Sequence, residues 1–264
     1  MPTVQRAHGP RGPPVPPLEL SEPDGGGGMA NATAVPDLVA HGDLEIVGRV
    51  RWSSNATFLA RVTADGDESL AIYKPRRGER PLWDFPTGTL CEREVAAYRL
   101  SEALGWGLVP PTVLRDGPVG DGMVQQFVPH DPEEHYFTLL PTHAERFRRM
   151  AVFDVLINNT DRKGGHCLLG DDGTVWSIDH GLTFHPAWKL RTVIWDFAGE
   201  PIDRAALDGV CRVAQLDRSL RAELEAHLSS LELDALAARA GELAADGRLP
   251  QPDAGYHSTP WPLV

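Results

Sequence analysis

The feature that most constrains the fold is a change of pattern along the chain, because short strands come first and long helices come later. The first half alternates β-branched and polar residues in short runs separated by turn signals such as ADGDE. These runs predict strands over 41–52, 57–66, 69–75, 110–116 and 122–129, with one helix over 91–107 between the third and the fourth.

The second half is mainly helical in pattern. Apolar residues recur at helical spacing over 143–159 and again through most of 202–245, with two short strands predicted at 167–170 and 174–179. A block of strands followed by a block of helices is typical of an α+β fold. We therefore expect two lobes: residues 41–130 form an antiparallel sheet with one helix, and residues 131–248 form a mainly helical lobe.

Both ends of the chain differ from these lobes. Residues 1–40 contain eight prolines and six glycines, including the run Gly25–Gly28. Such a segment buries little apolar surface, so we expect it to be disordered. Met29 follows the glycine run, so either Met1 or Met29 can be the translation start. Residues 249–264 are proline-rich and predicted to be an irregular tail.

Charge and composition exclude several classes of protein. The net charge of −12 argues against nucleic acid or an anionic membrane surface as the main partner. No run approaches the ~18 apolar residues that a membrane-spanning helix needs. The three cysteines lie far apart, without metal-binding or disulfide spacing, which favours a reducing cytoplasm.

Lysine is scarce, and its positions are therefore informative. Of 25 basic residues only three are lysines, at 74, 163 and 189, so 22 are arginines. Lys74 ends a predicted strand, and Glu94 follows on the next predicted helix. A strand lysine held by a helix glutamate is the arrangement that positions ATP phosphates in kinases. Glu92 is the alternative partner, but Glu94 is preferred because Val95 and Tyr98 mark the helix face near the sheet. A solvated strand end is the alternative role for the lysine.

The segments NNTDRKGGHCLL and WSIDHGL carry the strongest motif. Asp161 lies in a loop between a helix and a short strand, His166 follows five residues later, and Asp179 ends a second strand before His-Gly. A kinase catalytic loop has this spacing: a base aspartate, a metal ligand five residues on, then a strand-end aspartate that binds metal. A β-hairpin with polar turns is the alternative interpretation.

These segments resemble the type II phosphatidylinositol 4-kinase family and its wider phosphatidylinositol 3-/4-kinase-like relatives, which include bacterial HipA-like kinases. AIYKP resembles their lysine strand and GMVQQFVP their interlobe hinge, so the resemblance covers roughly residues 45–200 in order. The nearest likeness is a bacterial branch whose loop reads DRKGGH. The resemblance implies a two-lobed protein-kinase-like fold that uses ATP with Mg²⁺ or Mn²⁺.

The resemblance also implies roles for individual residues. Lys74 would contact the phosphates of ATP, and Glu94 would hold Lys74 in place. Asp161 would orient the acceptor hydroxyl, with Arg162 supporting the loop, and Asp179 would hold metal. Backbone groups of Gln126 and Val128 would bind adenine. Ser53 and Ser54, between the first two strands, could cap a phosphate, although a hairpin turn explains them equally well. His166 replaces the family's usual asparagine, and a nitrogen ligand suits Mn²⁺ better than Mg²⁺.

We therefore expect a cytoplasmic kinase that transfers the γ-phosphoryl group of ATP to a hydroxyl of a protein or small molecule. The alternatives are a nucleotide-binding pseudokinase and an enzyme that transfers AMP on the same fold. The C-terminal third has no polybasic patch and no clustered cysteines for lipidation, which argues against a phosphoinositide acceptor.

Overall fold

An antiparallel sheet dominates the N-terminal half of the computed structural model, which describes residues 28–29, 35–50, 55–253 and 257–264. The strands run in the order β2-β3-β4-β6-β5, which confirms the predicted five-stranded lobe, and β1 adds a short parallel pairing with β4. Their bounds are β1 Gly28–Met29, β2 Asp43–Arg49, β3 Phe58–Ala64, β4 Asp67–Pro75, β5 Thr112–Gly117 and β6 Gly120–Gln126.

The predicted disorder of residues 1–40 is wrong at its C-terminal end, because α1 spans Val35–His41. Val35, Leu38 and Val39 have the spacing of one helix face and are buried against the sheet. Pro36 lies in the first helical turn, where proline is tolerated, so the proline content of the segment concealed the helix. Residues 1–27 and 30–34 lie outside the described residues.

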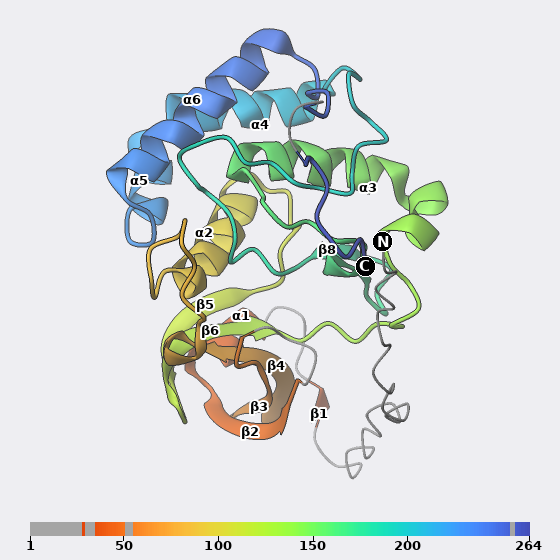
Figure 1. Ribbon diagram of the computed structural model, residues 1–264. Coiled ribbons are helices and arrows are strands. Elements are labelled where there is room, and N and C mark those ends of the chain that lie inside the picture. Colours follow the sequence, from red (N-terminus) through yellow and green to blue (C-terminus); the bar gives the residue numbers. More distant parts are fainter. Residues whose placement is uncertain (1–27, 30–34, 51–54, 254–256) are drawn as a thin grey trace, which may run out of the picture.

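The C-terminal half is mainly helical, as predicted, with one small hairpin and an irregular stretch over 178–203 (Figure 1). The helices are α2 Leu90–Ala103, α3 Tyr136–Ile157, α4 Arg204–Gln215, α5 Arg218–Leu224 and α6 Ser230–Asp246, with 3₁₀ turns η1 Arg76–Gly78 and η2 Gly164–His166, and the hairpin strands are β7 Cys167–Leu169 and β8 Val175–Ser177. Helix α3 starts before the predicted boundary and has non-helical torsions at His143, close to Pro141. Among the described residues, no helix has both the length and the apolar character needed to cross a bilayer.

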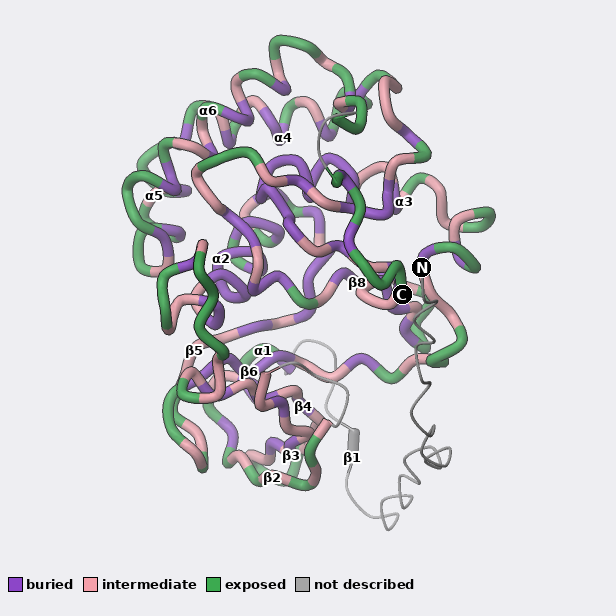
Figure 2. The backbone as a smooth tube through the Cα atoms, viewed as in Figure 1, coloured by how far each residue is buried: buried purple, intermediate pink, exposed green. Residues whose placement is uncertain are grey.

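Two hydrophobic cores hold the lobes, and α2 belongs to the larger one. The small core lies between α1 and one face of the sheet. The large core joins Ala97 and Leu100 of α2 to apolar side chains of α3, α4 and α6. Buried residues recur along α2 and α3 (Figure 2). Helix α2, predicted as part of the first lobe, contacts β5 and β6 of the sheet and α5 of the helical lobe. The segment therefore connects the sheet to the helical lobe.

Candidate active site

Lys74 lies near the end of β4, on the sheet face away from α1. Side chains alternate along a strand, so the buried Ala71 and Tyr73 face the small core and Lys74 points to the other side. There its Nζ contacts Glu94 Oε1 at 2.6 Å and Asp179 Oδ1 at 2.9 Å. Burial alone would lower the pKa of Lys74, but the two carboxylates outweigh it and raise the pKa. The ammonium is therefore charged and held from both lobes.

Glu94, and not Glu92, is the acidic residue of α2 that meets this lysine. Its other oxygen, Oε2, accepts a hydrogen bond of 2.8 Å from the backbone N–H of His180, next to the strand-end aspartate. Glu92 instead bonds Arg76 at 2.6 Å and His227 at 2.7 Å. The choice between the two glutamates made from helix spacing thus agrees with the structure.

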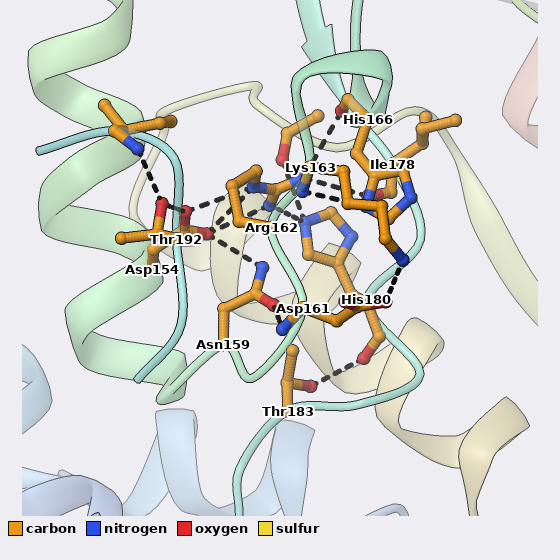
Figure 3. Close-up of polar contacts among 12 residues, drawn as sticks. Asp154, Asn159, Asp161, Arg162, Lys163, His166, Ile178, His180, Thr183 and Thr192 are labelled. Atoms are coloured by element: carbon orange, nitrogen blue, oxygen red, sulfur yellow. Dashed lines mark hydrogen bonds and ion pairs between the residues drawn. The ribbon is translucent and has the colours of Figure 1, made fainter. Parts of the chain in front are cut away.

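The loop that follows α3, residues 158–166, is shaped by its own two asparagines. Asn158 takes the left-handed conformation at φ 50°, and its amide donates to two carbonyls of the 185–187 segment. The side-chain amide of Asn159 donates from Nδ2 to Asp154 Oδ1 at 2.9 Å, and its Oδ1 accepts from the backbone N–H of Asp161 at 3.0 Å. These bonds fix the backbone from which the Asp161 carboxylate projects (Figure 3).

Arg162 lies behind this loop and is enclosed, with a side-chain exposure of 0%. Its guanidinium bonds both oxygens of Asp154 and the carbonyl of Ile178, and its Nη2 lies 2.9 Å from His180 Nε2 (Figure 3). The resemblance places Arg162 among the catalytic residues as support for the loop. The contacts of this buried side chain agree with that role, because its guanidinium donors are used within the protein.

Lys163 is a site residue that the sequence interpretation did not assign. Its Nζ lies 2.5 Å from Asp161 Oδ2, and both side chains remain partly open to solvent. Burial raises the pKa of Asp161 above its ordinary value, and Lys163 opposes that rise. The scarcity of lysine in this chain was the signal that could have identified it.

His166 and Asp179 face one another at the front of the loop, with Nε2 and Oδ2 3.5 Å apart. Burial lowers the pKa of His166 to about 4, so its ring is neutral at physiological pH. Lys74 holds the pKa of Asp179 well below its usual range. Asp179 also has φ 60°, an uncommon conformation for a residue other than glycine. A neutral imidazole beside an ionised carboxylate offers two donors that a divalent cation accepts.

The remaining predicted binding residues are less completely described. Ser53 and Ser54 lie outside the described residues. Gln126 ends β6, and its N–H donates to Pro111 at 2.9 Å. The Val128 carbonyl accepts a bond of 2.7 Å from the ring of the histidine two residues on. Adenine binding by these two backbone positions stays a prediction.

The third lysine joins the two lobes beside the same loop. Lys189 Nζ contacts Asp84 at 2.7 Å and lies 4.8 Å from the centre of the Trp83 ring. Phe85 packs edge-on against His185 across the same gap. Residues 83–85 come from the connection between β4 and α2, so these contacts fasten that connection to the helical lobe. All three lysines of the chain thus pair with carboxylates, and Lys74 and Lys189 do so between segments far apart in sequence.

Comparison with known proteins agrees with this geometry. The family model described as "Phosphatidylinositol 3- and 4-kinase" matches residues 114–205, which include Asp161, His166 and Asp179. "Protein Rv2133c" of Mycobacterium tuberculosis is 43% identical over 261 residues, spanning 85% of this chain and 94% of that protein. The crystal structure of a Helicobacter pylori proinflammatory kinase, CtkA, is similar with a TM-score of 0.50 at 13% identity, over 79% of this chain and 94% of that one.

Proposed function

Because the chain belongs to the phosphatidylinositol 3-/4-kinase-like superfamily, we propose that it is an ATP-dependent kinase that phosphorylates a hydroxyl of a protein or small molecule. One observation carries the proposal: Lys74 is held between Glu94 and Asp179, so a charged ammonium and a metal-binding carboxylate converge on one point. Phosphoryl transfer requires little else from a protein beyond a group that orients the acceptor.

Asp161 is the group that orients the acceptor. Its carboxylate projects from a loop fixed by Asn159 and Arg162 and remains partly exposed. In the transfer, the acceptor oxygen forms a bond to the γ-phosphorus, the bond from that phosphorus to the β,γ-bridging oxygen breaks, and ADP leaves. Asp161 accepts the acceptor's proton. Lys163 favours the ionised form of this carboxylate and adds positive charge beside it.

His166 and Asp179 are the residues that would hold Mg²⁺ or Mn²⁺. The donor set fits, because one is neutral and the other ionised, and both lie beside Lys74. No cluster of three metal-binding side chains occurs among the described residues, so nucleotide oxygens would complete the coordination. Bound metal neutralises charge on the nucleotide phosphates.

A purely nucleotide-binding module is less well supported. Such a module needs Lys74 and Asp179 but has no use for the ion pair of Asp161 with Lys163. An enzyme that transfers AMP would use the same carboxylates with the nucleotide bound in the opposite direction. Its product, an AMP adduct, would distinguish it from a kinase.

Mass spectrometry of the protein after incubation with ATP and Mn²⁺ tests the proposal. We expect phosphoryl adducts in the wild type, where a hydroxyl of the protein itself serves as acceptor when none is supplied, and none in Asp161→Asn. An AMP adduct would identify nucleotidyl transfer, and no adduct together with no loss of ATP would support the binding module.

A further inference from the structure

The segment 257–264 crosses the helical lobe and ends against the 158–166 loop. Its first anchor is the carbonyl of Ser258, which accepts hydrogen bonds of 3.0 Å from the N–H of Thr192 and from Trp195 Nε1. Thr192 in turn donates from its hydroxyl to Asp154, the carboxylate that holds Arg162. The Ser258 carbonyl thus links the segment, through Thr192, to Asp154, which holds Arg162 behind the loop.

The second anchor lies on the loop itself. The backbone N–H of Gly164 donates to the carbonyl of Leu263 at 2.7 Å. Gly164 is buried, and a methyl group at its α-carbon would lie 3.1 Å from Phe137, 3.2 Å from Val264 and 3.3 Å from the Leu263 carbonyl. Phe137 and the end of the segment therefore leave little room for a side chain at this position.

Gly164 is the first residue of η2, so its N–H has no acceptor within that turn. A buried N–H without a partner is costly, and Leu263 supplies the partner. The turn carries Lys163 at one end and His166 at the other, and its position fixes both side chains. The segment is thus bonded to the backbone between two residues of the proposed site.

We propose that residues 258–264 form a positioning element that holds the Lys163–His166 turn in its active geometry through the carbonyl of Leu263; the inference rests on the function proposed for that turn. The contacts of the segment favour a role in positioning this turn over a role in blocking the proposed site. They reach the backbone of Gly164, and among the described residues no hydrogen bond or ion pair joins the segment to the side chains of Asp161, Lys163 or His166, which pair within the site.

A set of variants of the whole protein separates the backbone contact from the side chains. Deletion of Leu263 and Val264 removes the acceptor, whereas Leu263→Ala with Val264→Ala keeps the carbonyl. Trp261→Ala is the matched control, because Trp261 belongs to the same segment but is 87% exposed. Amide exchange of Gly164 by NMR reports the contact without any need for activity.

In the deletion variant we expect faster exchange at Gly164 and a kcat lowered about five- to tenfold. The KM for ATP should stay within about twofold of wild type, because the Lys74–Glu94 pair is untouched. The double alanine variant should keep most of the protection of Gly164 and most of the kcat, and Trp261→Ala should match wild type in both.

Unchanged exchange and unchanged kcat in the deletion variant would overturn the inference, and a raised kcat would show that the segment obstructs the site. A wild type with no ATP turnover would instead refute the proposed function, and the catalytic part of the inference with it. The exchange rates would still show whether Leu263 protects Gly164, so the two failures are distinguishable.

Discussion

Replacing Lys74 with methionine should damage both the fold and the binding of ATP, and the two effects can be separated. Glu94 is only 2% exposed, and Lys74 is its charged partner at 2.6 Å. Removing the lysine leaves a buried carboxylate with the His180 N–H as its remaining partner. Breaking a buried ion pair in this way typically costs about 3–5 kcal/mol. Since Lys74 itself is one-fifth exposed, we expect the lower end, about 3 kcal/mol.

A double-mutant cycle separates the two effects. Its second substitution, Glu94→Gln, removes the buried charge and keeps an acceptor for the backbone N–H of His180. In the Lys74→Met background it should therefore restore about 2 kcal/mol of stability. It should not restore ATP binding, because the lost phosphate contact is worth about 1.5–3 kcal/mol, or roughly 10- to 150-fold in affinity. Glu92→Gln is the matched control, since it lies on the same helix without touching Lys74.

Urea denaturation gives the stabilities of the four proteins and of the control, and calorimetric titration gives their ATP affinities. The reasoning is refuted if Lys74→Met unfolds at the wild-type urea concentration, or if Glu94→Gln lowers stability equally with and without Lys74. Either result would mean that the two side chains act independently.

Four further predictions concern the remaining parts of the site and fold. Asp161→Asn should stop transfer with nearly unchanged ATP–metal affinity, whereas Asp179→Asn should weaken that affinity; equal affinities by calorimetry would contradict these roles. Lys163→Met should move the acid limb of kcat to higher pH, because the pKa of Asp161 rises when Lys163 no longer lowers it, and Lys163→Arg should keep the limb in place. His166→Asn should shift the preferred metal from Mn²⁺ towards Mg²⁺; identical metal profiles would leave coordination to Asp179 alone. A chain starting at Gly42 should lose roughly 2–5 kcal/mol in urea denaturation relative to one starting at Met29, because it lacks Val35, Leu38 and Val39; equal stabilities would show that α1 is dispensable.

The parts of the site that follow local rules could be predicted from the sequence. The order of a strand lysine and a helix glutamate predicted the Lys74–Glu94 pair, and the apolar face of the helix selected Glu94 over Glu92. The spacing from His166 to Asp179 depends on the short hairpin β7–β8, and the strands and the turn of this hairpin were both recognisable in the sequence. Each of these inferences uses residues close in sequence or a repeated geometry.

The missed features depend on tertiary contacts that composition does not encode. Arg162 was expected to support the loop, but the buried Asp154 through which it does so was not recognised from the sequence. Helix α1 was hidden because its few apolar residues become informative only once the sheet provides a surface. The bond from Gly164 to Leu263 joins two backbone groups, and a backbone contact leaves no mark on residue type.

The central claim is that these carboxylates and lysines transfer the γ-phosphoryl group of ATP, and a time course of ATP consumption followed by ³¹P NMR tests it most directly. The account predicts that wild-type protein with Mn²⁺ or Mg²⁺ converts ATP to ADP, with free phosphate or a phosphorylated product, and that Asp161→Asn does not. Accumulation of AMP and pyrophosphate, or equal rates in wild type and Asp161→Asn, would contradict it.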